Sequence, residues 1–444
     1  MENIEKLIIN EIDKRKDELI DYLGKLISFP SENEGIPGTG KETELQNYLF
    51  EDFLKSNFDK VEKIAANSKN HRPNIVGTLK GTENKNPLMI NAHADVVPVK
   101  KEELKKWLSD PYKATKKDNK IYGRGASDCK GGLAASILAA KILKELNIKL
   151  KNDLYILSSI GEESKEGETI GTSLVIDRGY RPGFAIIAEP SDCELHIESP
   201  GNFLFELKIK GKEAHVCTRG QILFPQRYGL PSGYKIGVDA IDKAIPFIKL
   251  MQKIETENCH KWKTATINGG GYPIPMDKQG LGVFTITPTH INAGQYFGAI
   301  SGYANIVFNV WYPNWLKEED VAMSIKEKIM HLAKTDEWLI DNPPEFIYPA
   351  IQHWAPFKTS IDNPGVKLLG ETLKEIQKEQ PIYSSFRAVC DATFLQQKGI
   401  SSVVFGPGGI SMSVHGPNEF VPISELIKSA KTYALFAYRW CNKN

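Results

Sequence analysis

The sequence lacks the features that would indicate a secreted, membrane-bound or nucleic-acid-binding protein. Its six cysteines include no Cys-x-x-Cys pair, so no disulfide framework is expected. The longest run of small and apolar residues, 131–140, is far too short to cross a membrane, and the start of the chain has no apolar signal-peptide region. The 56 basic and 55 acidic side chains leave a net charge of +1, which gives no electrostatic reason to bind nucleic acid or a membrane surface. We therefore expect a cytoplasmic protein.

The chain has 444 residues, too many for one compact core, so two domains are expected. In its first part and again near its end, short apolar runs alternate with stretches of helical periodicity. The runs are residues 75–79, 88–92, 154–159, 184–188 and 403–405, and the helical stretches are residues 3–28 and 131–146. Strands that alternate with helices predict an α/β domain with a mixed, mostly parallel sheet covered by helices on both faces.

A different pattern occupies the middle of the chain. It contains strands at 203–210, 283–287, 304–312 and 345–348, and helices at 241–251 and 321–332. The order β-α-β-β-α-β is that of a ferredoxin-like α+β unit. Pro246 lies inside the first of these helices and predicts a kink or a break. Because signals of the earlier kind resume near residue 351, we predict a discontinuous domain, residues 1–199 and 351–444, interrupted by an inserted domain, residues 200–350.

Polar side chains follow the strands predicted for the first domain. These are His93 with Asp95, Asp128 in a glycine-rich loop, Glu162 with Glu163, Glu189, and His415 near the end of the chain. Taken singly, each of these could be a surface residue without a function, since single histidines and acidic pairs are usually solvated. Five such sites after strands are harder to explain in that way, because burying charged groups is costly. Open α/β sheets bind their ligands at the carboxyl ends of strands.

The residue types fit a site for two divalent metal ions. Zinc binds imidazole nitrogen and carboxylate oxygen and keeps a position for water in catalytic sites. Two neighbouring ions need about one bridging carboxylate and two terminal ligands each. That requirement is met when Asp128 bridges, His93 and Glu189 hold one ion, and Glu163 and His415 hold the other.

Two acidic groups remain beside the five candidate ligands. Glu162 is available as a general base toward a water molecule between the ions. Asp95, two residues after His93, is placed to accept a proton from the imidazole and to fix its tautomer.

The sequence resembles the metallopeptidase family that includes acetylornithine deacetylase, succinyl-diaminopimelate desuccinylase, aminoacylase and carboxypeptidase G. The shared segments occur in the family's order and extend over the chain: His93-Ala-Asp95, residues 123–132, Gly161-Glu162-Glu163, Ala188-Glu189-Pro190 and residues 415–419. The resemblance implies a zinc-peptidase-like α/β/α domain, the ligands and the base named above, and a cis peptide after Asp128. It also implies two divalent metal ions. Zinc is the metal expected, with cobalt or manganese as alternatives.

The resemblance also gives a role to the inserted domain, which is a lid and the dimer interface in such families. A histidine of that domain reaches the partner's active site, and the matching residue here is His215, which would stabilise the oxyanion. Alternatively, His215 is simply a polar residue at a strand end, without a catalytic role. We therefore expect a homodimer that acts on a small-molecule substrate.

The chain departs from the family around the presumed substrate pocket. Gly298 and Trp311 stand where many relatives carry Asn and Arg, and Val389-Cys390-Asp391 replaces the usual Gly-Thr-Asp. We therefore do not expect this chain to recognise a substrate carboxylate in the family's usual way. Arg387 and Arg219 are candidate substitutes for binding an anionic group. Alternatively, both are surface arginines without a role in binding.

These observations predict a metal-dependent hydrolase that cleaves an amide bond. Relatives that act as aminopeptidases or dipeptidases tend to carry aspartate at the position of Glu189, which favours deacylation of an N-acyl amino acid or a related N-acyl amine. A dipeptidase or carboxypeptidase of the same family is the alternative. A non-catalytic binding protein is a remote one, because it would be expected to lack a ligand or the base.

Overall fold

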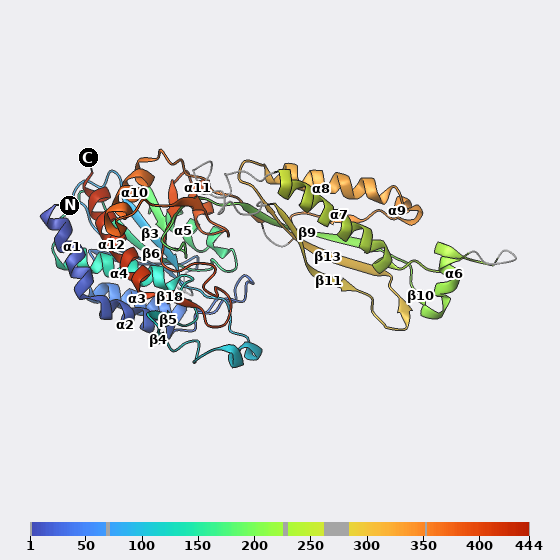
Figure 1. Ribbon diagram of the computed structural model, residues 1–444, viewed down its shortest axis with the longest axis horizontal. Coiled ribbons are helices and arrows are strands. Elements are labelled where there is room, and N and C mark those ends of the chain that lie inside the picture. Colours follow the sequence, from blue (N-terminus) through green and yellow to red (C-terminus); the bar gives the residue numbers. More distant parts are fainter. Residues whose placement is uncertain (1, 68–71, 225–229, 262–283, 351–352, 444) are drawn as a thin grey trace. The chain divides into compact units, whose positions relative to one another are not determined.

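The computed structural model describes residues 2–67, 72–224, 230–261, 284–350 and 353–443 (Figure 1). The chain divides into two compact units. The first consists of Met1–Glu198 and Phe357–Asn444, and the second of Ser199–Pro356. No helix among the described residues is long and apolar enough to cross a membrane.

An eight-stranded sheet forms the centre of the first unit, in the order β1-β2-β6-β3-β7-β17-β8-β16. Its strands are β1 (Lys60–Ile64), β2 (Asn74–Leu79), β3 (Leu88–His93), β6 (Leu154–Ser159), β7 (Phe184–Ile187), β8 (Leu195–Glu198), β16 (Tyr383–Ser385) and β17 (Ser402–Val404). The central strand β3 runs parallel to both of its neighbours, β6 and β7. Parallel pairing also joins β7 to β17 and β8 to β16, whereas β1–β2, β2–β6 and β17–β8 are antiparallel. The sheet is therefore mixed and mostly parallel, as predicted.

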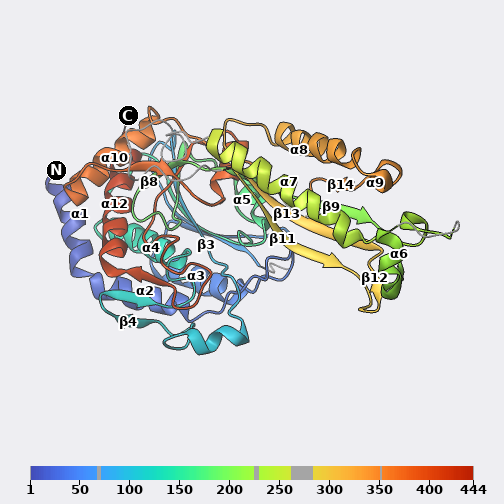
Figure 2. The same cartoon turned by 45° about the vertical axis from the view of Figure 1, so that its right-hand side comes forward.

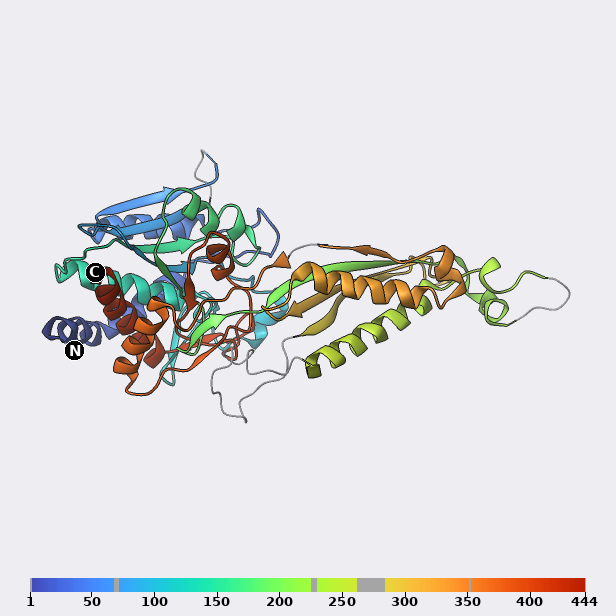
Figure 3. The same ribbon diagram turned by 90° about the horizontal axis from the view of Figure 1, so that it is seen from above.

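Helices cover both faces of this sheet. On one face α4 (Lys130–Glu145) contacts β3 and β6, and α12 (Ile423–Asn442) packs against α4. Figure 3 shows α1 (Asn3–Lys14) beside α12, so the two ends of the chain meet there. On the other face, α5 (Thr172–Asp177) and α11 (Ala392–Gln397) share a buried apolar cluster with the sheet. The single helix expected over residues 3–28 is two helices, since α1 ends at Lys14 and α2 (Lys16–Ile27) begins after Arg15.

The start of α4 lies unusually close to the end of β7. A Cβ atom added at Gly132 would stand 2.0 Å from the carbonyl oxygen of Ala188. Only glycine permits this approach without displacement of the backbone. The close packing brings Asp128 and Cys129, just before α4, near the end of β7.

The second unit has the predicted ferredoxin-like order. Its strands β9 (Gly201–Lys210), β11 (Thr285–Ala293), β13 (Tyr303–Tyr312) and β14 (Glu345–Ile347) form an antiparallel sheet in the order β11-β13-β9-β14. The helices α7 (Ala240–Lys261) and α8 (Glu318–Ala333) share one apolar cluster with this sheet (Figure 2). Of the kink or break expected at Pro246, the break was wrong, because α7 continues through this residue. Val283, the first residue of one predicted strand, lies outside the described residues.

Candidate metal centre

The candidate centre lies where neighbouring parallel strands end. His93 is the last residue of β3, Glu162 and Glu163 come shortly after β6, and Glu189 comes two residues after β7. Because β6, β3 and β7 run parallel, their carboxyl ends lie at the same edge of the sheet. The fold thereby gathers side chains that are far apart in the sequence.

His93 is the most enclosed of these side chains, with 1% of its side chain exposed. Its Nδ1 atom lies 2.9 Å from the main-chain oxygen of Asp95 and 3.6 Å from Oδ1 of the same residue. A carbonyl oxygen can only accept, so Nδ1 carries the proton. The Nε2 atom lies 2.9 Å from Asp128 Oδ1 and 3.5 Å from Glu189 Oε1. A proton on Nε2 donates to these carboxylates, and its loss frees the lone pair for a metal ion. Asp95 thus fixes the tautomer first through its main-chain oxygen, a contact the sequence did not indicate.

His415 meets the other side of Asp128. Its Nε2 atom lies 3.2 Å from Asp128 Oδ2 and 3.3 Å from Glu163 Oε2. The two oxygens of one carboxylate therefore face two different histidines, as expected of a bridging ligand. Glu163 Oε1 is buried and has no hydrogen-bond partner among the described residues, so it retains a free acceptor. The two imidazoles and three carboxylates fit a pair of divalent ions.

The surroundings of these groups shift their protonation in the metal-free protein. Burial lowers the pKa of His415, but its hydrogen bonds with Asp128 and Glu163 outweigh burial and raise it to about 11. Burial raises the pKa of Glu189 to about 7. For Asp128, the two histidines overcome burial and hold its pKa well below the usual range. The carboxylates therefore attract positive charge, whether it is a proton or a metal ion.

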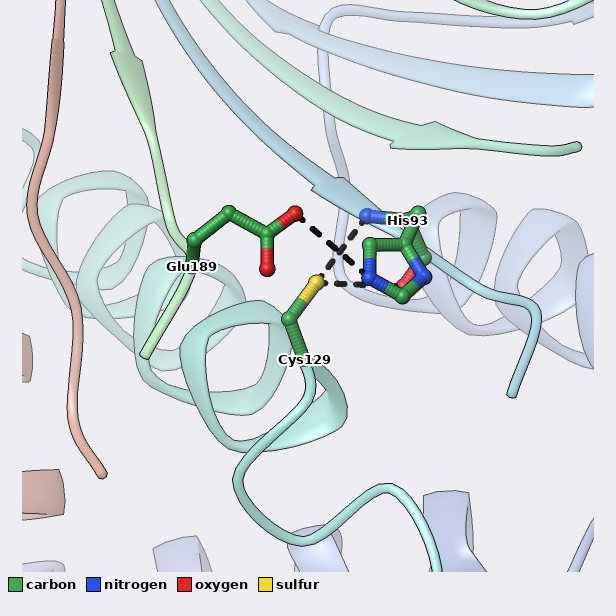
Figure 4. A group of neighbouring side chains, drawn as sticks. All are labelled: His93, Cys129 and Glu189. Atoms are coloured by element: carbon green, nitrogen blue, oxygen red, sulfur yellow. Dashed lines mark hydrogen bonds and ion pairs between the residues drawn. The ribbon is translucent and has the colours of Figure 1, made fainter. Parts of the chain in front are cut away.

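Cys129 is a neighbour that the predicted ligand set did not include. Figure 4 shows its sulfur beside His93 and Glu189. Among the described residues, these three form one of two groups of possible metal-binding side chains whose donor atoms lie within 4.8 Å of one another. The sulfur accepts a hydrogen bond from the main-chain N–H of His93 at 3.1 Å. Burial raises the pKa of the Cys129 thiol well above its usual value. The thiol also donates to the main-chain oxygen of His93 at 3.4 Å, so it packs against the end of β3.

Glu419 organises the loop that carries Asp128. Its Oε1 atom accepts the main-chain N–H groups of Ser127 and Asp128 at 2.9 and 3.0 Å. Its Oε2 atom accepts Gly125 N–H at 2.9 Å and Arg124 Nη1 at 2.8 Å. The peptide after Asp128 is cis, which confirms that expectation. The sequence placed Glu419 in a shared segment but gave no sign of this role.

Glu162 is half-buried beside the candidate ligands. Its main-chain N–H donates to Asp95 Oδ1 at 3.3 Å, and that of Glu163 donates to Asp95 Oδ2 at 3.0 Å. Burial, followed by the negative charge of Glu189, raises the pKa of the Glu162 carboxyl well above its usual value. A general base needs such an increased affinity for protons near neutral pH.

Asp391 is a second buried acid whose role was missed. Its Oδ2 atom accepts hydrogen bonds from Thr172 Oγ1 at 2.5 Å, Asn91 Nδ2 at 2.9 Å and Ser159 Oγ at 3.0 Å. It thereby ties β3 and β6 together just before their functional ends. The sequence marked residues 389–391 only as a departure from the family, yet the aspartate itself is kept.

The remaining candidates are not among the side chains that converge in the first unit. His215 ends the short strand β10 (Ala214–His215) of the second unit, is exposed, and accepts Cys217 N–H at 3.2 Å. Arg219 forms ion pairs with Asp239, at 3.1 Å, and with Asp242, so its charge is neutralised within that unit. Arg387 belongs to the first unit and is exposed.

Comparison with known proteins finds similar proteins over nearly the whole chain. Residues 89–439 match a family model described as peptidase family M20/M25/M40. The N-formyl-4-amino-5-aminomethyl-2-methylpyrimidine deformylase of Halalkalibacterium halodurans is 30% identical over 457 residues, covering 99% of this chain and 98% of that protein. The deformylase of the same name from Bacillus subtilis is 30% identical over 452 residues, covering 98% and 97%. Human carnosine dipeptidase 1 has a similar fold, with a TM-score of 0.72 at 16% identity and coverage of 99% of both chains.

Proposed function

The chain belongs to peptidase family M20/M25/M40 and is a metal-dependent amide hydrolase; on that premise, we propose that it removes a small acyl group from an amine nitrogen. The observation that carries this proposal is the placement of His93 and His415 on opposite oxygens of Asp128. The likeness to deformylases over nearly the whole of both chains supports an N-formyl amine as the first substrate to test.

The family binds two metal ions, and the residues present can hold them. In our proposal, His93 and Glu189 hold one ion, His415 and Glu163 hold the other, and Asp128 bridges. The nitrogen and oxygen donors favour zinc, with cobalt or manganese as alternatives. When bound, the ions would polarise the scissile carbonyl and lower the pKa of a water molecule toward about 7.

Glu162 supplies the proton transfers in this proposal. Its carboxylate accepts a proton from the attacking water, and the same carboxyl group then delivers that proton to the leaving amine. The raised pKa of Glu162 supports both steps, because the group must hold the proton between them. Asp95 holds the loop of Glu162 through two main-chain N–H groups.

The inserted unit has a proposed role in assembly. We propose a homodimer formed through this unit, in which His215 of each copy stabilises the oxyanion in the other copy's site. The exposure of His215 supports this role. Mixing His215→Ala protein with Glu162→Gln protein tests it, since a dimer that exchanges subunits would recover one intact site. Failure of the mixture to regain activity, with exchange shown by mass, would contradict the role in the partner's site.

A substrate panel on zinc-loaded and cobalt-loaded protein tests the proposed reaction. The panel contains N-formyl, N-acetyl and N-succinyl amino acids, the N-formyl aminomethylpyrimidine, and dipeptides. We expect release of the acyl acid from an N-acyl amine and slow or no cleavage of dipeptides. Preferential cleavage of dipeptides would favour the peptidase alternative. Stoichiometric metal binding without any hydrolysis would favour a binding protein.

A further inference from the structure

The side-chain amide of Asn33 lies between the two segments that carry the proposed catalytic groups. Its Nδ2 atom donates to Asp95 Oδ2 at 2.9 Å and to Ser164 Oγ at 3.0 Å, while its Oδ1 atom accepts Gly35 N–H at 3.1 Å. Both hydrogens and the oxygen of the amide are thus used, which fixes its orientation. Asn33 itself is completely buried. One side chain therefore joins the loop after β3 to the loop after β6.

The loop after β6 is supported from its outer side as well. Ser164 Oγ donates to Glu166 Oε2 at 3.0 Å, and Arg72 Nη1 donates to the same oxygen at 2.7 Å. Arg72 also forms a two-point ion pair with the buried Glu42, at 2.7 and 2.9 Å. Glu42 Oε1 in turn accepts Gly161 N–H at 3.2 Å. Glu162 and Glu163 therefore lie on a short segment held on both sides by charged hydrogen bonds, which are the stronger kind.

We propose that Asn33 is a positioning residue, which holds the Asp95 carboxylate and the Glu162–Glu163 loop at a fixed separation through Asp95 and Ser164. Since it is fully buried, it acts through these groups and not on the substrate. Without the amide, Asp95 Oδ2 keeps the Glu163 N–H but loses a donor within the buried site, and the loss of a donor to a buried charge is costly. The inference rests on the roles proposed for Asp95 and Glu162.

The test compares Asn33→Ala with a matched control, Ser31→Ala. Ser31 is also buried and donates to the main-chain oxygen of Ala94 at 2.6 Å, so the control removes a buried hydrogen bond to the same loop without touching Asp95. Zinc affinity is measured by competition with a chelator, kcat and KM on an N-acyl substrate that the wild type cleaves, and thermal unfolding for each variant.

We expect Asn33→Ala to lower zinc affinity about 10-fold and kcat about 10-fold. These losses are at the lower end of those seen when a residue that hydrogen-bonds to a metal ligand is removed. KM should not change, and Ser31→Ala should alter only stability. Wild-type zinc affinity and kcat in Asn33→Ala would overturn the inference, and so would equal losses in Ser31→Ala.

A second variant covers the case in which the Asn33→Ala protein fails to fold. Ser164→Ala is a milder change, which removes only the hydroxyl that accepts from Asn33 and donates to Glu166, so we expect a smaller loss of zinc affinity. Wild-type affinity in this variant would overturn the inference. The zinc measurement needs no substrate, so a wild type that cleaves nothing in the panel would contradict the proposed reaction alone.

Discussion

The two histidines of the candidate centre lie in opposite surroundings. His93 ends a central strand, has 1% of its side chain exposed, and is held by the main-chain oxygen of Asp95. His415 lies on a loop, has a left-handed backbone conformation with φ of 61°, and has 54% of its side chain exposed. Both contact Asp128, yet only one of them is fixed by the core.

This difference predicts different properties for the two proposed metal positions, which we call the His93 side (with Glu189) and the His415 side (with Glu163). A buried ligand whose second ring nitrogen is already bonded is preorganised for its ion. An exposed loop opens more readily than a core strand, so we expect the His415 side to exchange with solvent and to release its ion first. Four substitutions test this asymmetry, and their expected effects decrease from Glu162 to Asp95.

Glu162 belongs to neither side as a proposed ligand, so its removal separates chemistry from metal binding. Glu162→Gln should lower kcat by up to about 10⁴-fold, the upper range for loss of a general base, while both ions stay bound. Assay of hydrolysis beside elemental analysis of the same sample checks this. Undiminished turnover would exclude the assigned role.

His93→Ala removes the preorganised ligand and should empty the His93 side. We expect kcat to fall by about 10³-fold, since an ion contributes several kcal/mol to stabilising the transition state. Added zinc should not restore activity, because Glu189 and the Oδ1 atom of Asp128 lose the imidazole that lies between them and the core. Elemental analysis before and after zinc addition measures the zinc bound per chain, and two ions bound to His93→Ala would contradict the prediction.

His415→Ala should be milder because its loop is open to solvent. The expected loss in kcat is about 10²-fold at limiting metal, with recovery as zinc is raised, since a water molecule can take the vacant ligand position. Activity is measured across a zinc titration beside His93→Ala. If both variants recover activity to the same extent as zinc is raised, the proposed difference between the two sides is contradicted.

Asp95→Asn should have the smallest effect of the four substitutions. The main-chain oxygen that holds His93 Nδ1 is kept, but the acceptor for the N–H groups of Glu162 and Glu163 is weakened. Activity or zinc affinity should fall about 10–100-fold. Chelator competition and steady-state kinetics measure both, and a variant as impaired as His93→Ala would show that the carboxylate does more than orient its neighbours.

The convergence of the five candidate ligands was predictable because most of them follow strands with simple patterns. The apolar runs that became β3 and β6 are fully buried, so the polar residues after them were conspicuous. The edge strands β1 and β16 and the neighbouring strand β8 were missed, since they are short or carry mixed patterns. Neither glycine nor proline marks the division between α1 and α2 at Arg15.

The supporting residues could not be predicted, because their roles arise only from the folded chain. Asn33 and Ser164 are 131 positions apart, and Arg124 and Glu419 are 295 apart. Each is an ordinary polar residue locally, and no spacing rule connects such partners. Packing likewise decided that α7 passes through Pro246, against its local preference.

The most direct test of the account is anomalous diffraction from crystals of the cobalt-loaded or zinc-loaded protein. We predict two peaks roughly 3.5–4 Å apart, with Asp128 between them, His93 and Glu189 at one, and His415 and Glu163 at the other. On partial removal with a chelator, the peak beside His415 should weaken first. A single peak, or peaks at other residues, would contradict the proposed centre.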